Sequence, residues 1–316
     1  MVKKVLAVHF SQTGQAAALL ENIVRPLREQ ADVTLTHVAL DSTPRFPFPW
    51  PFWRFLDTFP ETVFLDPPAL ASLPLAGDEQ FDLIVLAYPV WFLSPPPPLT
   101  AFLQHPVARA VLRGRAVVTA TACRNMWVMA QETVKRLLRE AGARHLDHVA
   151  LVDRGPALAT FITTPRWVLT GRRDAFWGLP AAGVAEADLR GASRFGIALL
   201  QALRRGDETR DAPLLTGLGA CKVDTALVAS ERIGIRSFRI WGRALRALGR
   251  PGAPARRVLL FFYLLFLVAA IITIVPISML LRRALAPLLG ARLEQVRRAY
   301  EAPSGSGVER LGHDHG

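Results

Sequence analysis

Short apolar runs separated by amphipathic stretches fill the first half of the chain. The runs cover residues 5–10, 33–38, 81–88, 116–122 and 146–152. Runs of this length that are almost wholly apolar are typical of strands covered on both faces. Residues 16–29 and 131–141 carry apolar positions at helical spacing. Strands separated by helices predict an α/β fold, a doubly wound five-stranded parallel sheet over residues 1–155.

Two segments do not fit a minimal α/β unit. In residues 44–68, aromatic side chains are interleaved with prolines, which exclude a central strand or a long uninterrupted helix. This aromatic insertion either lines a groove for acyl chains, dips into a membrane interface, or simply covers the sheet. Residues 156–230 form an additional helical or irregular segment whose architecture the pattern does not define.

The last third of the chain is basic and then strongly apolar. Residues 231–255 predict a basic amphipathic helix and a linker, with arginines spaced three and four apart. Residues 258–281 carry no charge and are long enough to cross a hydrocarbon core of about 30 Å. Pro276 could kink this membrane helix, so spanning the bilayer and lying in it both stay open. Residues 282–316 form a basic tail, which we expect to be disordered from Pro303.

Charge and cysteine content narrow the function class. The net charge is +12, and the arginine helix directly precedes the apolar segment, which favours an anionic membrane surface. A solvated helix face is the alternative, and we expect no nucleic-acid partner. The two cysteines belong to no metal-ligand pattern, so no metal site is predicted, and their number fits a reducing compartment.

The loop after the first predicted strand is suited to a phosphate group. It consists of Ser11, Gln12, Thr13, Gly14 and Gln15. Two hydroxyls, a glycine that admits close backbone approach and the free N–H groups of the next helix would together bind a dianion. No acidic residue lies between Lys3 and Leu20 to repel it. The alternative is an ordinary strand-to-helix turn with a Ser or Thr cap.

The run VLAVHFSQTGQ resembles the first strand and phosphate loop of the flavodoxin-like family. Ser11, Thr13 and Gly14 match that loop, whereas Ala16 lacks its last hydroxyl. The resemblance implies FMN, whose ring would lie against two later loops. The first would contain Pro89, Val90, Trp91 and Phe92, and the second Cys123, Arg124 and Asn125. In the first loop Trp91 or Phe92 would stack on the ring, unless these aromatic side chains belong to the core.

No catalytic residue is identified from the sequence; Cys123 and Asn125 are the candidates. Cys123 would end a strand near the start of a helix, where a thiolate is favoured. A nucleophilic cysteine also needs a base, and His145 and His148 qualify only if the fold brings them close. The alternative is that Cys123 is a small packing residue.

A longer resemblance extends over most of the chain. The segments PFPWPFWRFLDTFPETVFLDPP, ACRNMW, ATFITTPRWVLTG, RSFRIWGRALR and YEAPSG are similar to flavodoxin-like proteins known as dialkylresorcinol condensing enzymes. That resemblance implies aromatisation of a cyclic diketone in dialkylresorcinol or aryl-polyene lipid biosynthesis. It also implies a ketosynthase and an acyl carrier protein as partners. The favoured function is therefore an FMN-dependent oxidoreductase acting on a hydrophobic cyclic or quinone-like substrate.

Two alternatives stay open at this point: a flavin-free cyclase or condensing enzyme of the same pathway, and a non-catalytic membrane scaffold for a ketosynthase. The basic start, Met1 to Lys4, is followed by too short an apolar run for a secretion signal. We expect the protein at the inner membrane with its catalytic domain facing the cytoplasm, where acyl carriers and reduced cofactors are found.

Overall fold

Five parallel strands form the central sheet. The computed structural model describes residues 2–312, with the backbone alone at 157–158 and 274–289. The strands are β1 (Lys3–His9), β2 (Val33–Ala39), β3 (Leu83–Tyr88), β4 (Ala116–Cys123) and β5 (Arg144–Val152). Their order is β2-β1-β3-β4-β5, and every neighbouring pair is parallel. The predicted α/β class with a five-stranded parallel sheet is confirmed.

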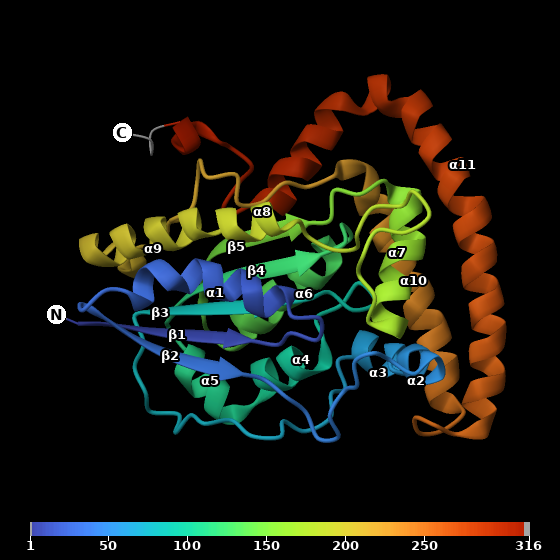
Figure 1. Ribbon diagram of the computed structural model, residues 1–316, viewed down its shortest axis with the longest axis horizontal. Helices are drawn as coiled ribbons and strands as arrows, with labels where there is room; N and C mark the ends of the chain where they lie inside the picture. Colours follow the sequence, from blue (N-terminus) through green and yellow to red (C-terminus); the bar gives the residue numbers. More distant parts are fainter. Residues whose placement is uncertain (1, 313–316) are drawn as a thin grey trace.

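One face of the sheet is covered by α1 (Gln15–Arg28), α8 (Glu186–Gly191) and α9 (Ser193–Arg205). Helix α9 lies directly against α1 (Figure 1). A Cβ atom at Gly196 would lie only 1.9 Å from the carbonyl oxygen of Ile23, so this glycine lets the two backbones touch. Helices α8 and α9 therefore pack on this face of the sheet, although they lie outside residues 1–155, the predicted first domain.

The other face is covered by α4 (Pro97–Gln104), α5 (Pro106–Leu112) and α6 (Val128–Glu140). The aromatic insertion adds two short helices, α2 (Phe52–Asp57) and α3 (Phe59–Val63), joined to the sheet by loops. Trp50 is buried in the core of this face, and Phe59 is buried against the C-terminal helices. The insertion thus links the sheet to the C-terminal part of the chain.

Three further helices, α7 (Ala157–Thr170), α10 (Thr225–Ala247) and α11 (Pro254–Glu301), lie beyond the carboxyl ends of the strands. Figure 1 shows α7 and α10 standing across that edge, with α11 running along α10 and then arching back toward the sheet. Two single-turn 3₁₀ helices, η1 (Asp207–Thr209) and η2 (Glu309–Gly312), complete the described elements.

Helix α11 contains the predicted membrane segment 258–281. Its portion Pro254–Thr273 is long and apolar enough to cross a bilayer, with a mean hydropathy of 2.2, and little of it is buried. From residue 274 to 281, the side chains of the predicted segment lie outside the described ones. Pro276 is among them, so the predicted kink at that residue has no side-chain description.

The chain after α11 is ordered where it is described. Disorder was expected from Pro303, but residues 305–310 run antiparallel to residues 217–221, with three backbone hydrogen bonds between them. The Ser304 hydroxyl also donates to Asp147 on β5 at 2.8 Å. These bonds satisfy polar groups that would otherwise be bound to water, and they hold the segment against β5 and residues 217–221. Residues 313–316 of the predicted tail lie outside the described part.

Candidate functional site

The loop between β1 and α1 lies at the point where the strand order reverses. Strand β1 pairs with β2 on one side and β3 on the other, so the chain winds away in both directions from here. Ligands of doubly wound sheets bind at this switch point, outside the carboxyl ends of the strands. The structure therefore places the predicted phosphate loop where the fold class locates ligand binding.

Gly14 gives this loop its conformation. Its φ of 87° is left-handed, it caps α1, and its carbonyl accepts a hydrogen bond from Ala18 N at 2.9 Å. No atom lies within 4 Å of the position that a Cβ would take, so the space beside Gly14 is open. The first turn of α1 has no acidic residue. An anion approaching the helix start meets free N–H groups and no opposing carboxylate there.

The side chains of the loop differ in what they already bind. The Ser11 hydroxyl is buried and has no hydrogen-bond partner among the described residues. Gln12 Nε2 donates to the Pro47 carbonyl at 3.0 Å, and Thr13 is half-buried. Gln15 exchanges two hydrogen bonds with the backbone of Val184, at 2.8 and 3.1 Å. Its amide thus fastens a distant segment to α1 and leaves only its backbone N–H for a phosphate.

The loop after β3 is a tight two-residue turn. Trp91 and Ser94 exchange backbone hydrogen bonds at 3.0 and 2.8 Å, and Phe92 and Leu93 have positive φ values of 49° and 59°. Trp91 packs edge-on against the rings of Phe10, Phe46 and Trp50. Phe92 packs against the rings of Phe55, Phe59 and Phe238. Both rings predicted to stack on a flavin therefore have aromatic neighbours, while Pro89 and Val90 are half-buried.

The loop after β4 offers one unpaired acceptor. Asn125 Oδ1 is buried and without a hydrogen-bond partner in the described part of the chain. Arg124 is occupied, because its Nε donates to Thr160 Oγ1 at 2.6 Å and its guanidinium lies 3.9 Å from the Phe161 ring centroid. Burial lowers the pKa of Arg124 to about 10. Of the two side chains predicted to face the ring, Arg124 is engaged, whereas Asn125 has an acceptor oxygen without a partner among the described residues.

Helix α7 and the segment after it cover this edge. Asp153, at the end of β5, accepts hydrogen bonds from Gly155 N and Gly183 N, both at 2.8 Å. The backbone N–H of Trp50 donates to the carbonyl of Val168 on α7 at 2.9 Å. Four buried polar atoms without a hydrogen-bond partner among the described residues lie on these segments: Ser11 Oγ, Trp50 Nε1, Asn125 Oδ1 and Thr163 Oγ1. Each of them has the capacity to bind a polar group of a ligand.

Sequence reasoning missed Trp50 and Thr163 as site residues. Trp50 stood in the aromatic insertion without a distinguishing pattern, and Thr163 lies on a helix whose position over the sheet depends on long-range contacts. The polar character of the ATFITTP segment was the one available signal.

Cys123 is not assembled with a histidine. Strand register pairs Cys123 with Val152 and Thr119 with His148. Cys123 and His148 are therefore separated by about 13 Å along the strands. Burial, followed by the nearby Glu231 carboxylate, raises the pKa of the Cys123 thiol. Since the thiol is the stable form and no imidazole is close, the structure gives no support to a Cys–His nucleophile.

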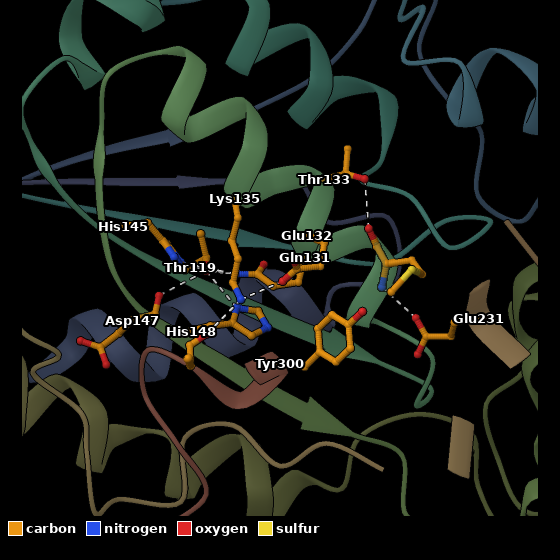
Figure 2. Close-up of polar contacts among 12 residues, drawn as sticks. Thr119, Gln131, Glu132, Thr133, Lys135, His145, Asp147, His148, Glu231 and Tyr300 are labelled. Atoms are coloured by element: carbon orange, nitrogen blue, oxygen red, sulfur yellow. Dashed lines mark hydrogen bonds and ion pairs between the residues drawn. The ribbon is translucent and has the colours of Figure 1, made fainter. Parts of the chain in front are cut away.

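The two histidines belong to a buried polar cluster further down the sheet. Figure 2 shows Thr119 between His145 and His148, with Oγ1 at 2.9 Å from each ring. Gln131 Nε2 donates to the same hydroxyl at 3.1 Å. Burial lowers the pKa of both histidines, that of His145 to about 4. Neutral rings, one buried at His148 and one half-buried at His145, fit a structural role. No metal-binding group of three His, Cys, Asp or Glu occurs among the described residues.

Glu231 of α10 contacts the start of α6, directly after the loop that follows β4. Its carboxylate accepts a hydrogen bond from Met129 N at 2.8 Å, at the start of α6. Figure 2 shows this contact. The other oxygen, Oε1, is buried without a partner among the described residues. Burial raises the pKa of Glu231 to about 7, so at neutral pH the carboxyl is divided between its two protonation states.

A cleft of about 670 Å³ opens beside the aromatic insertion. Most of its wall surface is apolar, formed by Phe46, Trp53 and prolines from four separate segments. Charged side chains also line it: Arg54, Asp57, Glu61, Asp66 and Arg257 from the start of α11. Phe46 also contacts Trp91 at the loop after β3, with ring centroids 5.2 Å apart. Phe46 therefore lines the cleft and also contacts the loop after β3.

The strand order decides the fold type, because β2-β1-β3-β4-β5 is the order of flavodoxin and its structural relatives. The fold is flavodoxin-like. No family model matches the sequence, and no curated protein does either.

Solved structures with low similarity to the flavodoxin-like chain include two flavodoxins and a quinone oxidoreductase. A flavodoxin from the domain Archaea is 12% identical and covers 64% of this chain and 99% of its own, with a TM-score of 0.35. A flavodoxin from Streptococcus pneumonia TIGR4 is 14% identical, with coverages of 63% and 98% and a TM-score of 0.33. The NAD(P)H:quinone oxidoreductase from Methanothermobacter marburgensis is 14% identical, with coverages of 63% and 96% and a TM-score of 0.30. The fold assignment rests on the strand order and not on these likenesses.

Proposed function

We propose that the protein is a membrane-attached, FMN-dependent oxidoreductase that acts on a hydrophobic cyclic or quinone-like substrate. The observation that carries the proposal is the loop at the end of β1, where a buried, unpaired Ser11 hydroxyl lies next to the open space at Gly14. A phosphate monoester would accept from both the hydroxyl and the free N–H groups of α1.

The spacing between the loops fits a ligand longer than a phosphate. Asn125 follows β4 and Ser11 follows β1, with β3 between them, so the two loops lie about 10 Å apart. The unpaired Asn125 oxygen would accept from a ring N–H, and the aromatic wall around Trp91 would exclude water on one side. A flavin bound between these loops would accept a hydride.

The proposed substrate class follows from this redox role and from the apolar surroundings. Converting a cyclic diketone into a dihydroxybenzene removes two electrons and two protons, which a hydride acceptor and a base can take up. We propose dialkylresorcinol or aryl-polyene lipid biosynthesis as the pathway of this step, on the sequence resemblance described above. A ketosynthase and an acyl carrier protein would be the partners, and the cytoplasmic side of the inner membrane the location.

Titration of the purified, detergent-solubilised apoprotein with FMN, FAD and riboflavin tests the cofactor. We expect quenching of flavin fluorescence with FMN and weaker quenching with riboflavin, which lacks the phosphate. Ser11→Ala should weaken FMN binding by roughly 10- to 100-fold and leave riboflavin binding unchanged, because a hydrogen bond to a charged group contributes about 1.5–3 kcal/mol. Ser72→Ala, in an exposed loop, is the matched control.

A second pair of variants separates the proposal from the flavin-free alternative. Gly14→Leu should abolish FMN binding, since its side chain would enter the open space that the phosphate needs. Cys123→Ala should leave turnover of a cyclohexanedione largely intact. Absence of any flavin binding, or loss of turnover in Cys123→Ala with flavin binding unchanged, would refute the redox assignment.

A further inference from the structure

The first half of α11 presents a continuous apolar strip on its outer side. The exposed residues recur at helical spacing and are 46–67% exposed: Val258, Phe261, Phe262, Leu265, Val268 and Ile272. On the opposite side of the helix, Leu260 and Tyr263 are buried against α10 and the aromatic insertion. A contiguous apolar surface of this length marks a contact surface. We call these six residues the α11 strip.

The chemistry around the α11 strip fits an anionic bilayer. Arg250 and Arg257, near the start of the helix, are exposed and have no ion pair within the described part of the chain. Helix α2 contacts α11 and carries Phe52 and Trp53, which are 39% and 42% exposed. Arginines and aromatic rings at the margin of an apolar surface complement anionic headgroups and the interfacial layer. A second copy of this +12 chain would instead bring like charges together.

Both ends of α11 are bound to the rest of the described chain by polar contacts. At the first end, Arg256 is fully buried, with its guanidinium 2.8 Å from Asp57 Oδ1 and 2.9 Å from Glu61 Oε1. At the other end, Glu301 accepts a hydrogen bond from Val223 N at 3.0 Å. Figure 1 shows the helix arching between these attachments. A helix crossing the bilayer once would hold its ends about 30 Å apart on opposite sides.

From these contacts we infer that α11 lies in one leaflet, along the membrane plane, with the α11 strip in the acyl layer and both helix ends on the side of the sheet. The inference rests on the membrane attachment proposed above and is independent of the flavin. It makes the protein monotopic and accounts for an apolar helix that also carries a buried ion pair at one end.

The arginine helix then contributes less to membrane contact than its sequence suggests. Trp241 of α10 packs on Tyr263 and Phe266 of α11, so that side of α10 faces α11. Arg239 and Arg243, each two positions from Trp241, point about 200° around the helix from it. They face away from α11, and Arg250 and Arg257 are the cations at the strip.

Flotation with vesicles containing phosphatidylglycerol tests the contact. We expect the full chain to float, and Ile272→Glu to lower its partition coefficient at least roughly tenfold, because a carboxylate would enter the acyl layer. Ile240→Glu on α10 is the matched control, since Ile240 is 71% exposed and Ile272 67%. It should float like the wild type. Equal loss in the two variants would overturn the assignment of the strip.

Cysteine labelling decides the topology. Leu248→Cys and Arg298→Cys lie near the two ends of α11 and are exposed. In sealed membrane vesicles of known orientation, a membrane-impermeant maleimide should label both from the side of the sheet. Labelling from opposite sides would overturn the one-leaflet arrangement while leaving membrane attachment intact. A full chain that does not float, or a lipid-free dimer that Ile272→Glu dissociates, would overturn the attachment itself.

Discussion

The buried guanidinium of Arg256 holds the start of α11 on the aromatic insertion, and its removal should loosen that helix. The side chain has 0% exposure. It donates to Asp57 Oδ1, to Glu61 Oε1 and Oε2 at 2.8, 2.9 and 3.0 Å, and to the carbonyls of Gly249 and Asp57 at 3.1 Å. Arg256→Met keeps most of the buried stem and deletes every one of these hydrogen bonds.

The size of the stability loss depends on how Asp57 and Glu61 fare without the Arg256 guanidinium. Removing one partner of a buried ion pair typically costs about 3–5 kcal/mol, because the remaining charge is left uncompensated. Asp57 and Glu61 keep 12% and 19% of their side-chain surface exposed, so water can solvate them in part. We therefore expect a loss near the lower limit, about 3 kcal/mol.

Amide hydrogen exchange over residues 254–263 is the direct assay. A loss of about 3 kcal/mol in local opening energy would lower protection there roughly 100-fold, while amides of the central strands change little. Arg257→Met is the matched control, since Arg257 is exposed and has no ion pair among the described residues. Adding Asp57→Asn and Glu61→Gln to Arg256→Met should restore most of the protection. If Arg256→Met protects as well as the wild type, the buried pair does not fasten α11.

Two further predictions test the packing of the sheet and the acid at its edge. Gly196→Ala should destabilise the protein by at least about 1–3 kcal/mol, because the new methyl would lie 1.9 Å from Ile23 O. The shift of the urea midpoint measures this loss. Gly191→Ala is the control and should cost far less, because its methyl would meet only the end of the Arg194 side chain. Glu231→Gln should flatten stability against pH between about 4.5 and 7. The folded pKa of Glu231 is raised to about 7, so the folded state binds the extra proton in this window, and the contribution of Glu231 to stability falls as pH rises through it. A stability difference between wild type and Glu231→Gln that is the same at pH 5 and at pH 8 would contradict the burial of this charge.

Local signals were sufficient for the strands and the first loop. The run predicted at 116–122 is β4 at Ala116–Cys123, and the run at 81–88 contains β3 at Leu83–Tyr88. Buried parallel strands are readable because nearly every position is apolar. The turn at Gly14 was also readable, since a glycine between a strand and a helix marks the left-handed residue that the structure shows there.

Contacts between segments that are distant in the sequence could not be predicted from it. Gln15 was expected to face a phosphate, but its side chain binds Val184, and nothing in the pattern of either segment reports the other. Trp91 was expected beside a ring, but whether it stacks on a ligand or on Trp50 depends on where the aromatic insertion folds. The Gly/Ser-rich residues after Pro303 read as disordered by composition, although the Asp147 carboxylate on β5 supplies a partner for Ser304.

The additions to the flavodoxin-like unit converge on one edge, and this convergence connects the two proposals. The cleft lined by Trp53 and Arg257 opens next to the start of the α11 strip, while Phe46 extends its wall to Trp91 at the switch point. A substrate with a long alkyl chain is too insoluble to arrive through water, since each buried methylene favours the apolar phase by about 0.8 kcal/mol. If α11 lies in the leaflet, the cleft at its start adjoins the membrane, and the contact between Phe46 and Trp91 would connect the cleft wall to the loops proposed to hold the flavin. Because Asp57 and Glu61 both pair with Arg256 and line the cleft, displacement of α11 would disturb the cleft wall as well.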